Sequence, residues 1–196
     1  KKLMYENRIE KILVIDAADS LTGLVTMKDI EKSAEHPDAT KDQQGQLMVG
    51  AAIGTGADTL KRATELVKAG IDVVVVDRAH GHTKNVLDTI KMIKKEFKDI
   101  DIIGGNIATA EAAIALRDAG ADAVKVGMGP GSICTTRIIA GIGVPQMTAI
   151  MDIKAALKED DISIIDDGGI RFSGDISKAL AAGADTVMLG SIFDGT

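Results

Sequence analysis

The sequence predicts an α/β fold with a parallel sheet, and a repeated tetrapeptide is the strongest reason. Ala-Gly-Ile-Asp at residues 69–72 recurs as Ala-Gly-Ala-Asp at residues 119–122 and again at residues 182–185, each time after a helical pattern and before a short apolar run. The glycine suits the left-handed position that ends a helix, and the apolar run is typical of a strand buried on both faces. The low aromatic content of 2% and the 21 glycines fit helices packed closely on such strands better than a β-sandwich.

The remaining apolar and helical patterns complete an alternation of strands and helices. We expect strands at Met48–Ile53, Asp72–Asp77, Asp101–Gly105, Ala123–Gly127, Ile162–Asp166 and Thr186–Gly190. We expect helices at Asp58–Ala69, Lys84–Phe97, Ala110–Ala119, Thr148–Leu157 and Asp175–Ala182. This alternation is typical of parallel sheets with helical crossovers. One long interval between strands contains a glycine-rich segment, residues 127–146, and long loops in compact domains usually carry function.

The first 46 residues have a different pattern. Lys11–Asp16 and Leu21–Thr26 predict a β-hairpin, and Met27–Glu31 predicts a short helix after it. The polar composition of residues 33–46 is typical of a linker. We therefore expect one small unit at residues 1–32, a linker at 33–46 and the α/β domain at 47–196.

Composition excludes several classes of protein. The chain has 196 residues, of which 45% are hydrophobic and 27% charged, so it can bury a core and is not a disordered chain. No apolar run is long enough to span a membrane, and a net charge of −6 argues against nucleic-acid binding. One cysteine excludes an internal disulfide and fits a reducing cytoplasm, and the N-terminus lacks a secretory signal. His80 and His82 have no third ligand nearby, so we expect no metal there.

The glycine-rich segment at residues 127–137 holds the strongest candidates for chemistry. Its sequence, Gly-Met-Gly-Pro-Gly-Ser-Ile-Cys-Thr-Thr-Arg, exposes backbone groups that can cradle an anion or a monovalent cation. A lone cysteine is more often a small buried hydrophobe, but Cys134 lies beyond the carboxyl end of a strand, beside hydroxyls and a basic side chain. This setting makes Cys134 a candidate nucleophile, and Arg137 offers a planar fork for phosphate or carboxylate.

Polar residues also follow four other predicted strands. Asp-Asp-Gly-Gly at residues 166–169 predicts either an ordinary turn or a carboxylate for ribose hydroxyls beside N–H groups for a phosphate. Gly190 and Ser191 end the last strand, and the loops after the last strands of a β/α barrel usually bind phosphate. Asp77 could bond a ribose, and Asn106 ends a further strand. Because parallel strands end at one edge of a sheet, we expect these residues in one site.

Taken together, these segments resemble the inosine-5′-monophosphate (IMP) dehydrogenase family. Residues 129–137 resemble its catalytic loop, and the similarity continues in order from about Lys41 to Thr196. The matching segments outside that loop are Asp77 with residues 79–82, Gly105-Asn106, residues 167–170, residues 173–175 and residues 188–191. Lys11–Ile30 resembles the end of a CBS regulatory domain, which this family inserts into its barrel.

The resemblance implies a (β/α)8 TIM barrel, with about six of its eight units in this chain. It implies oxidation of IMP to xanthosine monophosphate with NAD, through a covalent thioimidate on Cys134. The implied roles are catalysis by Cys134 and Thr136, substrate binding by Ser132, Asp167, Gly168, Gly169, Gly190 and Ser191, and cofactor binding by Asp77, Arg78, Asn106, Gly127 and Gly129. Carbonyl groups of Gly129, Gly131 and Cys134 would coordinate a potassium ion. The resemblance implies a homotetramer, and we expect it to be cytoplasmic. We expect no nucleic-acid or membrane partner.

The sequence departs from the family pattern at three places. Arg78 stands where the family usually has Ser or Thr, which would alter the cofactor pocket. The chain also begins within the CBS region, without the first two barrel strands, and stops before the mobile flap, so we expect little turnover from these 196 residues alone.

Two alternatives stay open. One is GMP reductase, which shares the barrel and the cysteine loop; we expect Lys11–Ile30 and His80–His82 to favour the dehydrogenase over it. The other is a purine-nucleotide-binding fragment without catalysis.

Overall fold

A computed structural model describes residues 1–195, which form two compact units divided between Met48 and Val49. The first unit contains α1 (Lys2–Asn7), an antiparallel hairpin of β1 (Lys11–Ile15) and β2 (Leu21–Thr26), and α2 (Met27–Glu35). Thr26 and Asp29 cap α2, since each side chain accepts the other residue's backbone N–H. The hairpin agrees with the prediction, α2 continues past the predicted end at Glu31, and α1 was not predicted because six residues are too few for a periodic pattern.

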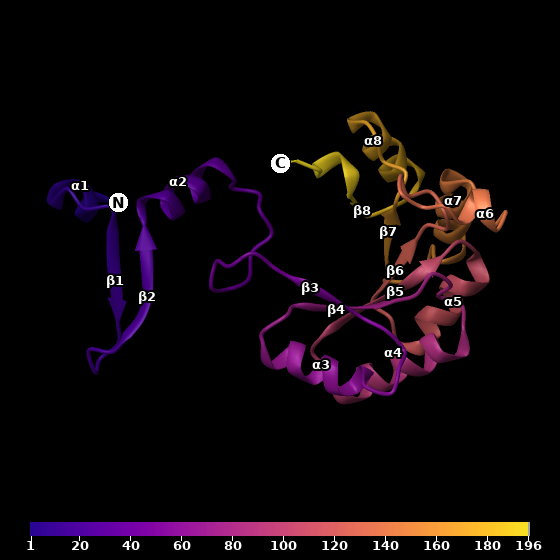
Figure 1. The fold of residues 1–196 in the computed structure, drawn as a ribbon, viewed down its shortest axis with the longest axis horizontal. Coiled ribbons are helices and arrows are strands. Elements are labelled where there is room, and N and C mark those ends of the chain that lie inside the picture. Colours follow the sequence, from indigo (N-terminus) through magenta and orange to yellow (C-terminus); the bar gives the residue numbers. More distant parts are fainter. Residues whose placement is uncertain (196) are drawn as a thin grey trace. The chain divides into compact units, whose positions relative to one another are not determined.

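The second unit is a curved sheet of six parallel strands in the order of the chain (Figure 1). The strands are β3 (Gly50–Ile53), β4 (Val73–Asp77), β5 (Asp101–Ile107), β6 (Ala123–Val126), β7 (Ser163–Asp167) and β8 (Thr186–Met188). The helices are α3 (Thr59–Lys68), α4 (Lys84–Glu96), α5 (Ala110–Ala119), α6 (Thr136–Ile139), α7 (Gln146–Ala156) and α8 (Ser173–Ala182), followed by a 3-10 turn, η1 (Ser191–Phe193). Within the described chain, β3 and β8 each pair on one side only, so the sheet is a partial β/α barrel.

The repeated tetrapeptide has a structural reason. Its three glycines, residues 70, 120 and 183, have φ angles of 87°, 100° and 117°, which reverse the chain after each helix. Each of its three aspartates accepts a backbone N–H from a residue at the amino end of a neighbouring strand, namely β3, β5 or β7. The pairs are Asp72 with Val49 at 2.7 Å, Asp122 with Ile102 at 2.8 Å and Asp185 with Ile164 at 2.8 Å. Each repeat therefore joins a helix to its strand and ties that strand to its neighbour.

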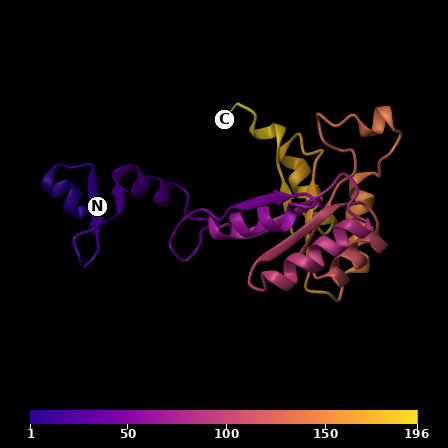
Figure 2. The same cartoon turned by 60° about the horizontal axis from the view of Figure 1, so that its bottom comes forward.

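The core lies between the sheet and the helices on its outer side (Figure 2). The fully buried strand residues on this face are Val74, Val76, Ile102, Val124, Val126 and Ile164, and they meet Ile90, Ile93, Leu116, Ile150 and Ile153 from α4, α5 and α7. Because side chains alternate along a strand, the neighbouring positions face the opposite, concave side. Asp77, Lys125 and Asp167 occupy such positions near the carboxyl ends of β4, β6 and β7.

All six strands and all five helices predicted for the α/β domain are present. Helix α5 has the predicted bounds, and the other elements differ from their predicted bounds by one or two residues at an end. Helix α7 begins at Gln146, two residues before the predicted start, because Pro145 rather than Thr148 precedes its first turn. The short helix α6 within the glycine-rich segment was not predicted. No helix in residues 1–195 is long and apolar enough to cross a membrane.

Candidate active site

Two hollows lie at the carboxyl ends of the strands. The larger, of about 430 Å³, is lined by residues that include Asp77, Arg78, Asn106, Lys125, Gly127, Gly129, Cys134 and Thr136. The smaller, of about 280 Å³, is lined by residues that include Ser132, Gly169, Arg171, Gly190 and Ser191. Gly131, Asp167 and Gly168 line both. All fourteen predicted site residues thus line one hollow or the other, as expected from strands that end at one edge.

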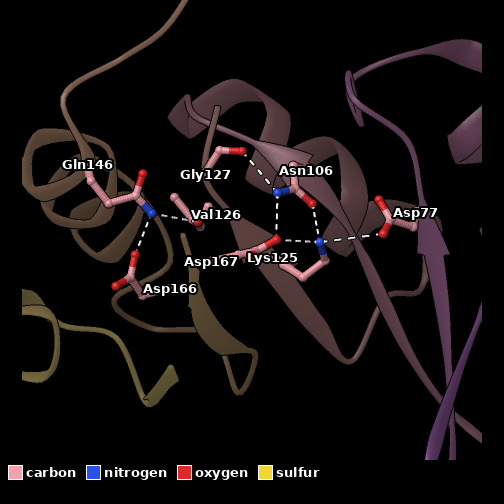
Figure 3. A network of polar contacts seen from close by, with 8 residues as sticks. All are labelled: Asp77, Asn106, Lys125, Val126, Gly127, Gln146, Asp166 and Asp167. Carbon is pink, nitrogen blue, oxygen red and sulfur yellow. Dashed lines mark hydrogen bonds and ion pairs between the residues drawn. The ribbon is translucent and has the colours of Figure 1, made fainter. Parts of the chain in front are cut away.

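Lys125 is the centre of a polar network in the larger hollow (Figure 3). Its ammonium Nζ lies 2.6 Å from Asp167 Oδ2 and 3.7 Å from Asp77 Oδ2, and it donates to Asn106 Oδ1. The amide of Asn106 donates to Asp167 Oδ2 at 2.8 Å and to the carbonyl of Gly127 at 3.0 Å. Asn106 lies at a register shift between β5 and β6, and a bulge of this kind redirects a side chain. The network brings together two carboxylates that are 90 residues apart in sequence.

Cys134 and Thr136 are neighbours in the loop between β6 and α7. Cys134 Sγ lies 3.3 Å from Thr136 Oγ1, and the Cys134 N–H donates to the carbonyl of Gly131 at 3.0 Å. The pKa of the Cys134 thiol is below its ordinary value, chiefly because the Thr136 hydroxyl bonds the thiolate. The Thr136 backbone N–H and the charge of Arg137 act in the same direction, and burial opposes them. A thiol with a lowered pKa is a better nucleophile at neutral pH.

Arg137 was expected to bind a phosphate or carboxylate, and its guanidinium instead bonds backbone carbonyls of the loop. Its guanidinium donates to the carbonyl of Val144 at 2.6 Å and to the carbonyl of Met128 at 3.3 Å. A Cβ at Gly129 or Gly143 would lie 2.7 Å from Arg137 Cγ, so both glycines leave room for this side chain. Arg137 therefore joins the two ends of the loop that carries Cys134, and these bonds use donors that we expected to face a ligand.

The turn after β7 requires its two glycines. Gly168 and Gly169 have φ angles of 99° and 86°, which L side chains rarely adopt. A Cβ at Gly168 would also lie 3.0 Å from Pro130 Cγ and 3.1 Å from the Gly131 nitrogen, so the turn packs against the cysteine loop. Gly168 and Gly169 both line the smaller hollow, and without side chains their backbone N–H groups can approach an anionic group there.

Asp166 and Asp167 are adjacent in sequence and differ in environment. Asp167 lines both hollows, whereas Asp166 is 1% exposed and faces α7, where Gln146 Nε2 donates to its Oδ1. Burial raises the pKa of Asp166, the Gln146 bond opposes this, and the charge of Asp167 adds to it. The turn motif left two carboxylates open, the family resemblance pointed to Asp167, and of the two only Asp167 lines the hollows.

Lys125 and Gln146 are the residues that sequence reasoning missed. Lys125 is the one charge in the run Ala-Val-Lys-Val, and a charge inside a strand buried on both faces was a signal that it has partners. Gln146 Nε2 also donates to the Val126 carbonyl at 2.7 Å, which fastens the end of the cysteine loop to β6. Among the described residues, no group of three or more His, Cys, Asp or Glu is placed to hold a metal ion.

A curved parallel sheet with a thiol, two carboxylates and glycine-rich turns at its carboxyl edge defines a β/α-barrel protein with a ligand site where barrel enzymes carry theirs. The family described as the IMP dehydrogenase / GMP reductase domain matches residues 8–196. The chain belongs to this family.

Curated relatives match the whole chain. An inosine-5′-monophosphate dehydrogenase of Aquifex aeolicus is 58% identical over 196 residues, which are 100% of this chain and 40% of the relative. One of Mycobacterium tuberculosis H37Rv is 56% identical over 195 residues, which are 99% of this chain and 37% of the relative. This chain therefore spans about 40% of the length of these relatives.

A solved structure of a GMP reductase from Trypanosoma brucei has a TM-score of 0.86 and is 47% identical, over 97% of this chain and 44% of that one. An overlap of 97% leaves about six of 196 residues outside, so it includes much of Lys11–Ile30. The prediction that this segment distinguishes dehydrogenases from GMP reductases is therefore wrong, because at least one GMP reductase has a counterpart of it.

Proposed function

We propose that the protein is an IMP dehydrogenase, which oxidises IMP to xanthosine monophosphate with NAD. The observation that carries the proposal is the Cys134 thiol, whose pKa is lowered and which lines the same hollow as Asp77 and Asp167. The curated relatives of A. aeolicus and M. tuberculosis bear this enzyme's name, and this supports the proposal.

The proposed reaction has two halves. In the first, the Cys134 thiolate forms a bond to C2 of the hypoxanthine, and the hydrogen on C2 leaves with its electron pair as a hydride to NAD, which gives a thioimidate and NADH. In the second, water adds to C2 and the C–S bond breaks, which returns the thiolate; one proton of the water goes to N3 of the purine and the other to solvent. Thr136 would position this water, since its hydroxyl lies 3.3 Å from Cys134 Sγ.

The two hollows divide the ligand contacts. Asp167 would bind the ribose hydroxyls of IMP, and Ser132, Gly168, Gly169, Gly190 and Ser191 in the smaller hollow would bind its phosphate. Asp77, Arg78, Asn106, Gly127 and Gly129 in the larger hollow would bind NAD, which supplies the hydride acceptor. Arg78 donates to Thr55 Oγ1 at 3.1 Å, so its side chain lies along the rim near β3.

Potassium is a further proposal for the cysteine loop. Carbonyl oxygens of Gly129, Gly131 and Cys134 are the hard, neutral ligands that suit a monovalent cation. The Gly131 carbonyl already accepts the Cys134 N–H and has its second lone pair for the ion. We also propose that residues 1–32 are the end of a CBS domain, that residues 33–46 link it to the barrel domain, and that the whole enzyme is a cytoplasmic homotetramer.

The experiment is a pair of assays. In the first, calorimetry measures IMP binding to the full chain. In the second, this chain replaces the matching 196 residues of the A. aeolicus relative, and the absorbance of NADH is followed with IMP and NAD. We expect turnover in the chimera, loss of turnover with Cys134→Ala, and loss of IMP binding with Asp167→Ala. A chimera that is inactive while the unaltered relative is active would contradict the proposal.

GMP reductase is the second candidate, because the solved relatives of T. brucei bear that name. The same chimera distinguishes the two, since a reductase consumes a reduced nicotinamide cofactor with GMP and produces none with IMP. A third outcome, IMP binding that depends on Asp167 without turnover in either direction, would indicate a nucleotide-binding fragment. The isolated chain, whose sheet ends at β3 and β8, is expected to give little turnover by itself.

A further inference from the structure

Lys125 is a buried cation in the middle of an apolar strand. Its side chain is 6% exposed, and its neighbours Ala123, Val124 and Val126 on β6 are buried hydrophobic residues. An ammonium group in such surroundings requires compensating partners, since removing it from water is costly. Packing alone therefore does not explain a lysine at position 125.

The register of the sheet supplies those partners. Asp77 pairs with Gly105 on β5, and Gly105 pairs with Lys125 on β6, so the three residues form one row on the concave face. Gly105 has no side chain, and a Cβ there would lie 2.7 Å from Lys125 Cβ. The glycine therefore lets the lysine side chain pass, and the ammonium reaches Asp77 Oδ2 on one side at 3.7 Å and Asp167 Oδ2 on the other at 2.6 Å.

The Asp167 carboxylate is bonded asymmetrically. Lys125 at 2.6 Å and Asn106 at 2.8 Å both donate to Oδ2, and Oδ1 accepts no hydrogen bond from residues 1–195. Asp167 lines both hollows, and its side chain is 23% exposed. Two donors on one oxygen fix the plane of the carboxylate and leave the other oxygen to a ligand.

We propose that Lys125 is the positioning residue that aims Asp167 Oδ1 at the vicinal hydroxyls of the ligand's ribose. This inference rests on the proposed function, because it takes the ligand to be a nucleotide. Lys125 also separates two carboxylates that would otherwise repel each other across the hollow. Its removal leaves Asp167 with Asn106 as the remaining donor to Oδ2, which fixes the carboxylate less firmly, and with an unbalanced charge. The affinity that is lost is that of the ribose contact, since the proposed phosphate contacts line the smaller hollow.

The experiment compares two ligands on three proteins. Calorimetry measures the binding of IMP and of its 2′,3′-dideoxy analogue, which lacks both hydroxyls, to the full chain and to its Lys125→Met and Lys125→Arg variants. We expect Lys125→Met to weaken IMP binding about tenfold or more and to change binding of the analogue less than about twofold. Lys125→Arg keeps the charge and is expected to recover part of the preference for IMP.

Lys94→Met is the matched control. Lys94 Nζ also lies 2.7 Å from a carboxylate oxygen, that of Asp122, at the opposite edge of the sheet. This variant removes a lysine–aspartate ion pair of similar length, though a more exposed one, away from both hollows, and is expected to leave the ratio of the two affinities unchanged. Equal weakening of both ligands by Lys125→Met, or no weakening of IMP, would overturn the inference.

A measurement on the unsubstituted protein covers the case in which Lys125→Met does not fold. With 15N-labelled lysine, IMP is expected to shift the NMR resonance of the Lys125 ammonium, and the dideoxy analogue is expected to shift it much less. Equal shifts would contradict the inference while nucleotide binding stands. Absence of binding by either ligand would overturn the proposed function as well.

Discussion

Replacing Asp122 by alanine tests how the repeated aspartates hold the sheet together. Asp122 Oδ2 accepts the Ile102 N–H at 2.8 Å, and the Asp122 carboxylate also pairs with Lys94 at 2.7 Å. Ile102 is fully buried, and Asp122 Oδ2 is the acceptor of its N–H in the described chain. The variant therefore leaves a buried donor unpaired at the start of β5.

The magnitude follows from these two contacts. A hydrogen bond to a charged acceptor contributes about 1.5–3 kcal/mol. The Lys94 pair adds less than about 1 kcal/mol, because both side chains are about a third exposed and solvent screens them. We expect the free energy of unfolding to fall by about 2–3 kcal/mol, which lowers the urea midpoint by about 1 M for a typical dependence on denaturant.

The assay is urea unfolding of the full chain followed by far-ultraviolet circular dichroism, with amide hydrogen exchange at Ile102 as a local measurement. Asp118→Ala is the matched control, because Asp118 pairs with Arg117 at 2.9 Å but is 62% exposed, and its removal is expected to change stability by about 0.5 kcal/mol or less. Equal midpoints for the two variants, or unchanged exchange at Ile102, would refute the reasoning.

Three further predictions concern the site. Thr136→Ala removes the main cause of the lowered thiol pKa, so the pH midpoint of Cys134 alkylation by iodoacetamide is expected to rise; an unchanged midpoint would assign the shift elsewhere. Gly127→Ala places a Cβ 2.0 Å from a backbone oxygen of β7 and is expected to cost more than about 2 kcal/mol of stability in urea unfolding, whereas Gly56→Ala, with nothing within 4 Å, is expected to cost little. Burial raises the pKa of Asp166, so the native state holds its proton to higher pH than the unfolded chain does, and stability from this group falls as pH rises above the usual aspartate range. The stability of Asp166→Asn minus that of the unsubstituted chain is therefore expected to be larger at pH 7 than at pH 4. The same difference in thermal unfolding at both pH values would contradict this.

Much of the fold could be predicted because its signals are local. A glycine with positive φ and a capping aspartate are properties of a few adjacent residues, and three copies of them located the strands that follow. Element ends were less predictable. Helix α6 has four residues, and its start depends on how the loop around Cys134 folds back on Gly131.

The convergence of these residues on the two hollows was also predictable from the sequence. Parallel strands place their carboxyl ends together, so polar residues after each strand converge without further information. The partners of each side chain were not accessible. Arg137 was expected to face a ligand, and it bonds the carbonyls of Met128 and Val144 instead, because the loop brings these groups within its reach.

The sequence by itself determined a parallel α/β domain, a thiol on a glycine-rich loop, and the family to which these motifs belong. Periodicity, turn chemistry and motif order are properties of residues close together in the chain, so they survive in the sequence. Tertiary structure alone decided which side chains hold Asp167 in place at the hollows. Strand register places Lys125 beside Gly105 and within 2.6 Å of Asp167, and register depends on pairings between residues that are tens of positions apart.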